Sequence, residues 1–134
     1  MKTALLVAAL AATPALAASP CDGIWQKPLA DGRALLKATP IKGIGSKPKV
    51  YELMQTGKWS VVWAEFSDAE PGGYFIQGGH YVDVWGGVAA GETAAEIGKW
   101  ASKLGAPKPL AACFGWYVVE GRETKAAWPN PFKG

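Results

Sequence analysis

The chain has 134 residues, a formal net charge of +3 at pH 7 and only two cysteines. Its 14 Lys and Arg and 11 Asp and Glu are spread along the sequence, without the basic cluster that marks a protein binding nucleic acid or an anionic membrane. This length suits one small domain.

Residues 1–17 have the features of a cleavable bacterial-type signal peptide. Lys2 precedes an apolar run over residues 4–12, which is too short to span a bilayer. Pro14 then breaks the run, and an Ala-Leu-Ala triplet ends at Ala17 with small residues where a signal peptidase reads the chain. We therefore expect cleavage after Ala17 and export of the rest.

Export to an oxidising compartment makes Cys21 and Cys113 the expected partners of one disulfide. The mature domain is expected to cover residues 18–134 and to stay out of the membrane, because it has no second apolar run of membrane-spanning length. The protein is then periplasmic or secreted. Its tail, residues 121–134, contains two prolines and is expected to be loosely ordered.

The first helix signal is a weak amphipathic pattern within residues 23–37, interrupted by Gly32. The middle of the chain then alternates with a period of two, as strands do. Two short turn signals, Thr56-Gly57 and Gly78-Gly79, divide this region into two hairpins. The four predicted strands are residues 49–55, 58–66, 74–77 and 80–85.

The best helix signal follows the strands, over residues 93–104. Thr93 and Glu96 have the spacing of a capping box, and an apolar stripe runs on to Gly105, which can end the helix. Residues 110–120 are ambiguous, with a helical start and a strand expected after Gly115. The predicted fold is α+β: a four-stranded antiparallel meander, a helix on one face, and an N-terminal helix and C-terminal segment joined by the disulfide.

Pairing across the two turns decides which side chains share a face of the sheet. In the first hairpin Met54 would face Trp59, and in the second Tyr74 would face Asp83. In matching register, one face combines aromatic rings with carboxylates and becomes a candidate ligand-binding surface. Its predicted residues are Trp59, Trp63, Glu65, Tyr74, Tyr81, Asp83 and Trp85. The alternative is that helix 93–104 or the C-terminal segment covers these rings as core.

Residues 21–25 (CDGIW) and 79–85 (GHYVDVW) resemble segments of the papain-like peptidoglycan amidases and endopeptidases, in which a cysteine opens a helix and a histidine lies on a later strand. The resemblance implies a cysteine hydrolase of cell-wall peptide that uses Cys21 and His80, with Asp83 as a third member. This chemistry needs a thiolate beside an imidazole. A disulfide at Cys21 would remove the thiolate.

One histidine and two cysteines that are expected to be bonded leave few ligands for a metal ion. The Gly-x-Gly at residues 43–45 lacks the strand-to-helix context of a nucleotide site. No metal and no cofactor are therefore expected. The leading interpretation is a non-enzymatic exported binding protein whose partner is an envelope protein or a glycan, and the alternative is the cysteine hydrolase.

Overall fold

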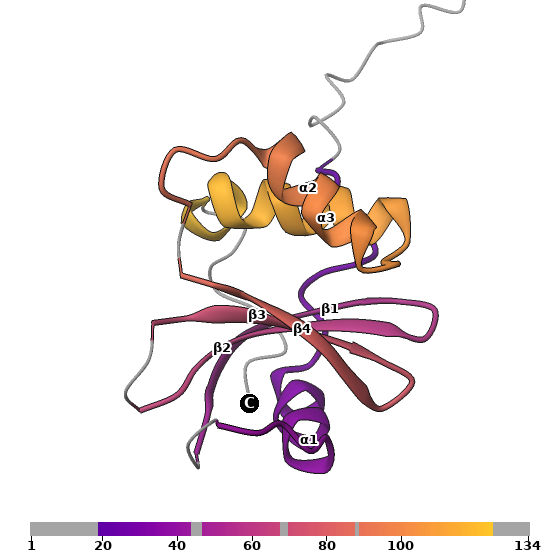
Figure 1. Cartoon of the computed structure of the whole chain (residues 1–134), viewed down its shortest axis with the longest axis vertical. Coiled ribbons are helices and arrows are strands. Elements are labelled where there is room, and N and C mark those ends of the chain that lie inside the picture. The colour runs from indigo at the N-terminus through magenta and orange to yellow at the C-terminus, as the bar shows by residue number, and fades with distance from the viewer. Residues whose placement is uncertain (1–18, 44–46, 68–69, 88, 125–134) are drawn as a thin grey trace, which may run out of the picture.

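The computed structural model describes residues 19–43, 47–67, 70–87 and 89–124, so the predicted signal peptide and residues 125–134 lie outside the described residues (Figure 1). The described residues form a four-stranded sheet with helices on both faces, which confirms the α+β prediction. In chain order the elements are α1 (Leu29–Ala38), β1 (Lys49–Thr56), β2 (Trp59–Glu65), β3 (Gly72–Gln77), β4 (His80–Gly86), α2 (Ala94–Lys103), α3 (Lys108–Val119) and the 3-10 helix η1 (Gly121–Glu123).

The strands pair in sequence order as the predicted antiparallel meander, β1-β2-β3-β4. Gly78 and Gly79 have φ values of 54° and 82°, and a type I′ turn requires a positive φ at both positions. The first hairpin turns at Gly57 and Lys58 and not, as predicted, at Thr56 and Gly57. Gly57, with a φ of 58°, takes the first central position, where a type II′ turn needs glycine.

Two helical layers enclose the sheet: α2 and α3 lie over one face, and α1 lies under the other (Figure 1). On the α3 side, the Phe114 ring packs against Phe75 and Trp63 with centroids 4.8 and 6.2 Å away. On the α1 side, Leu36 joins a smaller core that includes Val62 of β2. Both faces of the sheet are therefore buried.

Helix α2 forms where its capping signal predicts it. Thr93 Oγ1 accepts a hydrogen bond from Glu96 N at 3.1 Å, and Glu96 Oε2 accepts one from Thr93 N at 3.2 Å. At the other end Gly105 has a φ of 99°, and Ala106 N donates back to the carbonyl of Ala101. This is the left-handed helix end that glycine favours.

The other two helix predictions needed correction. Helix α1 begins at Leu29 and not near residue 23, because the preceding residues form a turn. The strand expected after Gly115 is wrong, since α3 continues as one helix to Val119. The β-branched residues there are tolerated because most of α3 is buried against the sheet and α2, and tertiary burial outweighs local propensity.

Two predicted cross-strand pairs are wrong. The changed first turn pairs Met54 with Val61 and not with Trp59. A bulge in β4 pairs Tyr74 with Val84 and not with Asp83.

Each edge strand contains one bulge. The β1–β2 register shifts between Val50 and Glu52, and the β3–β4 register shifts between Phe75 and Ile76. One strand gains an unpaired residue at each shift, so the alternation of faces changes there. A period-two sequence pattern cannot show where such an extra residue lies.

The segment before α1 crosses the edge of β1 and connects the two helical layers; we call residues 21–28 the N-terminal strap. Its first residue, Cys21, is bonded to Cys113 of α3, which confirms the predicted disulfide. Farther along, Ile24 O accepts a hydrogen bond from Gln55 N at 2.9 Å, and Lys27 N donates to Leu53 O at 3.2 Å. The strap therefore occupies backbone groups on the outer edge of β1.

Helices α2 and α3 approach closely because small residues lie where they cross. A Cβ added at Gly115 would collide with the carbonyl oxygen of Ala94, and one added at Gly98 would lie 3.2 Å from the carbonyl oxygen of Ala111. These obstacles are backbone atoms, which cannot move aside as a flexible side chain can. The helix pair leaves no room for a methyl group at Gly115.

Replacing Gly115 by Ala should therefore destabilise the domain by about 1–3 kcal/mol through overpacking. The matched control is Gly86→Ala, since a Cβ at Gly86 meets no atom within 4 Å. Urea unfolding of both variants measures the difference. Equal unfolding midpoints for the two variants would contradict the packing derived for α2 and α3.

Removing the disulfide by Cys21→Ala with Cys113→Ala should cost about 4 kcal/mol, because the bond closes a loop over a sequence separation of 92 residues. Chemical unfolding of the variant and of the wild type gives this value. Native wild-type protein should also show no thiol that reacts before reduction and two that react afterwards. A reactive thiol in the native, unreduced protein would overturn the assignment.

Candidate functional site

The seven residues of the predicted aromatic and acidic face do not share one side of the sheet. Trp59 and Trp63 are 6% and 3% exposed beneath α2 and α3. Tyr74 lies in the core above α1, and Tyr81 packs on that same side. Trp85 packs on the α2 side. The prediction of a single shared face is wrong. Trp59 and Trp63 follow the alternative in which helix 93–104 and the C-terminal segment cover the rings, whereas Tyr74 is buried on the other face, in the core with α1.

Glu65 lies at the end of β2, where it pairs with Lys49 of β1. Its Oε2 accepts a hydrogen bond from the Tyr51 hydroxyl at 2.8 Å, and Lys49 Nζ lies 5.4 Å from the Tyr51 ring centre. The bond to Glu65 and then burial raise the pKa of Tyr51. Glu65 thus belongs to a polar contact between β1 and β2, away from β4.

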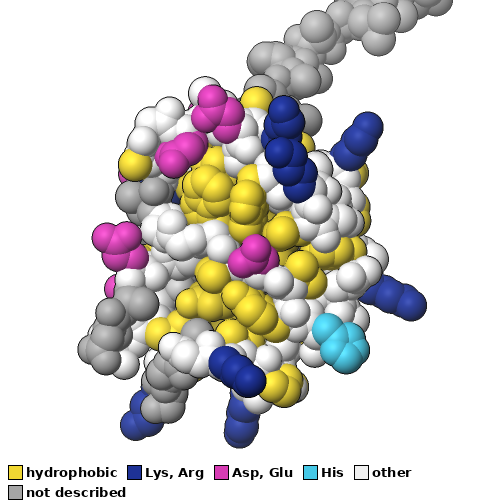
Figure 2. Space-filling view, in the orientation of Figure 1, with side chains coloured by type: hydrophobic (Ala, Val, Ile, Leu, Met, Phe, Trp, Pro, Cys, Tyr) yellow, Lys and Arg dark blue, Asp and Glu magenta, His cyan; other side chains and the backbone are white. Residues whose placement is uncertain are grey.

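Three of the predicted ligand-binding residues, Tyr81, Asp83 and Trp85, remain together on β4, and all three are half-buried. They lie on the last strand of the sheet. Figure 2 shows hydrophobic side chains gathered where α2 and β4 face the viewer, with acidic side chains beside them. We call the residues Tyr81, Val82, Asp83, Val84, Trp85 and Trp100 the β4 surface.

The two tryptophans of the β4 surface form an edge-to-face pair. The ring centres of Trp85 and Trp100 lie 5.2 Å apart with planes at 71°. Phe75 supports Trp100 from below at 5.4 Å. Trp85 Nε1 is buried and has no hydrogen-bond acceptor within the described part of the chain, although buried indole N–H groups usually have one.

The carboxylate of Asp83 lies beside the backbone of its own strand. Its Oδ1 accepts a hydrogen bond from Val84 N at 2.7 Å. Burial and then the charge of Asp83 raise the pKa of Tyr81. The β4 surface therefore has a negative group between an indole pair on the α2 side and Tyr81 and Val84 on the α1 side.

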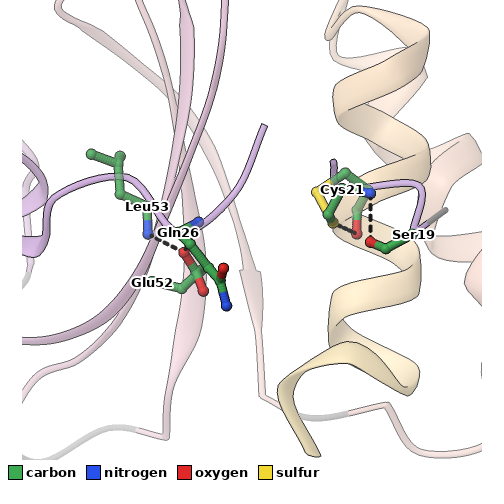
Figure 3. Close-up of a disulfide and its surroundings, with 6 residues drawn as sticks. Ser19, Cys21, Gln26, Glu52 and Leu53 are labelled. Carbon is green, nitrogen blue, oxygen red and sulfur yellow. Dashed lines mark hydrogen bonds between the residues drawn. A yellow bond between two sulfur atoms is a disulfide. The ribbon is translucent and has the colours of Figure 1, made fainter. Parts of the chain in front are cut away.

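The catalytic alternative loses its nucleophile, because Cys21 is bonded to Cys113 and is 0% exposed (Figure 3). His80 is exposed at the start of β4, and the carboxylate of Asp83 is bonded to Val84 N. Cys21 is bonded to α3 and begins the strap, which runs along β1. Strand β1 is at the opposite edge of the sheet from β4, which carries His80 and Asp83. The structure does not bring the three residues together.

Glu52 is a buried carboxyl group whose importance the sequence pattern did not reveal. It is 2% exposed, and its Oε1 accepts hydrogen bonds from Gln26 N at 2.5 Å and Leu53 N at 3.1 Å (Figure 3). Gln26 has a φ of 57°, which is uncommon outside glycine. Burial raises the pKa of Glu52 to about 7 despite the two backbone donors. Glu52 thus holds the bend of the strap.

The sequence pattern also missed the role of Trp100. It lies in the apolar stripe predicted for the helix at residues 93–104, which did not show that it is half-buried and pairs with Trp85. A helical period identifies the inward face but not where that face passes the edge of the sheet. Trp100 lies at that boundary.

Neither a metal site nor a membrane span emerges from the described residues. No three His, Cys, Asp or Glu side chains gather there in a way that could hold a metal ion. Within the same residues, every helix is too short or too polar to cross a bilayer. The disulfide fits an oxidising compartment.

Glu52→Gln should remove much of the dependence of stability on pH. Folding raises the pKa of Glu52 from 4.5 to about 7, so the folded state keeps a proton that the unfolded state releases in that interval. The contribution of Glu52 to wild-type stability should be greatest below about pH 4.5 and fall by up to about 3 kcal/mol as the pH rises through 7.

Glutamine keeps an oxygen acceptor for Gln26 N without ionising, so Glu52→Gln should exceed the wild type in unfolding free energy at pH 8. Urea unfolding from pH 4 to 8 makes the comparison. The control Glu120→Gln removes an exposed carboxylate and should retain the wild-type fall. A Glu52→Gln profile that falls as steeply as that of the wild type would contradict the assignment.

No protein-family model, curated protein or solved structure matches this chain. The functional proposal therefore rests on the residues described above.

Proposed function

We propose that this chain is an exported, non-enzymatic binding protein that holds a protein of the cell envelope on the β4 surface. The observation that carries the proposal is the pair of half-buried tryptophans, Trp85 and Trp100, at the edge strand of the sheet. Tryptophan is enriched among the residues that dominate protein interfaces. Most other large aromatic rings of the described chain are already buried.

The geometry of the pair favours a protein over a glycan. A sugar ring stacks on an open aromatic face, whereas the edge-to-face contact between Trp85 and Trp100 covers part of one indole with the other. Protein interfaces are enriched in tryptophan and need no open ring face for stacking.

The chemistry of the cysteines supports binding over hydrolysis. Cys21 and Cys113 form a buried disulfide, so neither sulfur is available as a thiolate. The bond instead stabilises a small exported domain, in which disulfides commonly have a structural role. The proposed localisation is the periplasm or the medium.

Trp100→Ala should weaken retention of the envelope partner at least tenfold, because loss of a hot-spot tryptophan commonly costs 2 kcal/mol or more. The test is a pull-down from host envelope extract over a series of bait concentrations, with the retained protein quantified by mass spectrometry. Thermal unfolding shows that each bait remains folded.

The matched control is Trp116→Ala. Trp116 is also a half-buried tryptophan in an edge-to-face pair, with its ring centre 5.3 Å from that of Trp25, but it lies on α3 outside the β4 surface. The control should retain the partner. Equal losses for both variants, or none for Trp100→Ala, would refute the β4 surface as the binding site.

A further inference from the structure

The two edges of the sheet differ in what covers them. The outer edge of β1 is covered by the strap, through Gln55 N to Ile24 O and Lys27 N to Leu53 O. Beyond β4 no further strand follows among the described residues. Backbone groups on the outer edge of a terminal strand are the natural partners of another extended chain.

Apolar side chains border the β4 edge on both faces of the sheet. Val82 and Trp85 pack toward the α2 side, and Tyr81 and Val84 toward the α1 side. Successive side chains of an added strand point alternately to these two sides. The side chains on both sides of the added strand would therefore contact apolar surface. On a sheet with one face open to solvent, the side chains on only one side would do so.

Asp83 restricts which strand can add. Its carboxylate already accepts the Val84 N–H at 2.7 Å, and the register shift opposite Phe75 and Ile76 disturbs the regular ladder. Charged side chains and bulges are common devices that protect an edge strand from unspecific pairing. An incoming carbonyl can take the Val84 N–H only if the carboxylate moves and finds another partner.

We propose that β4 receives an extended, basic segment of the envelope partner as a fifth strand, and that Asp83 selects it. This rests on the proposed function of the β4 surface. A Lys or Arg side chain beside Asp83 pairs with the displaced carboxylate, and the Val84 N–H then bonds to the added backbone. An acidic or neutral segment offers no such compensation, so Asp83 is a specificity-determining residue.

Two labelled nine-residue peptides test this proposal. Both alternate Val and Thr, with Lys at the centre of one and Glu at the centre of the other. Fluorescence anisotropy at low salt should show the wild-type protein binding the Lys peptide at least fivefold more tightly than the Glu peptide. Asp83→Asn should reduce this ratio to near one, while Glu120→Gln, which removes an exposed carboxylate at the C-terminal cap of α3, should preserve it.

Hydrogen exchange provides a second readout, because binding of the Lys peptide should slow exchange along β4 and leave the strap-covered edge of β1 unchanged. Binding of both peptides with equal affinity, an unchanged ratio in Asp83→Asn, or binding of neither peptide would each overturn the strand-addition proposal. In those cases, a Trp100→Ala bait that loses the partner from envelope extract would still support the β4 surface as a binding site. A Trp100→Ala bait that keeps the partner would reject both the binding site and the strand addition.

Discussion

The covalent link between Cys21 and Cys113 is the constraint on which the arrangement of this domain depends. It fixes the start of the strap to a buried position on α3, between the helical layer and the sheet. From there the strap must pass the edge of β1 to reach the opposite face, where α1 packs (Figure 1). One bond therefore joins the two layers and closes one edge of the sheet. The buried carboxyl of Glu52 holds the bend that this path requires.

The same path explains why the molecule is asymmetric. With β1 covered and both faces of the sheet buried, β4 is left as the exposed edge among the described strands. Its residues from Tyr81 to Trp85 are all half-buried, a pattern found in no other strand of this sheet. Tyr81, Trp85 and Trp100 remain half-buried at this edge, while helices cover most of the other rings of the described chain. The binding role proposed for β4 rests on this asymmetry, because the helices and the strap cover the other surfaces of the sheet.

The sequence alone predicted the order of the strands, the capping box of α2 and the disulfide, because each depends on local signals or on simple cysteine counting. It failed where tertiary structure decides. The bulge near Glu52 shifts side chains between faces, and no local pattern marks it. The residues after Gly115 have strand propensity but are buried as helix. For the candidate site, Tyr81, Asp83 and Trp85 do lie on one strand, but the β4 bulge places Tyr81 and Trp85 on opposite faces of the sheet. The part played by Trp100 and the separation of Trp59 from Tyr74 required the packing of α2 and α1.

For the proposed export, in which the chain crosses a membrane from its N-terminus, the position of the two cysteines also sets the order of events. Cys21 emerges early, but its partner follows 92 residues later, after every strand of the meander. Each hairpin joins neighbouring segments and needs no distant residue to form. The Cys21 thiol therefore stays unpaired while the sheet can already form. The disulfide then forms in a chain that has largely folded. This order exposes the Cys21 thiol to a disulfide with the wrong partner before Cys113 follows.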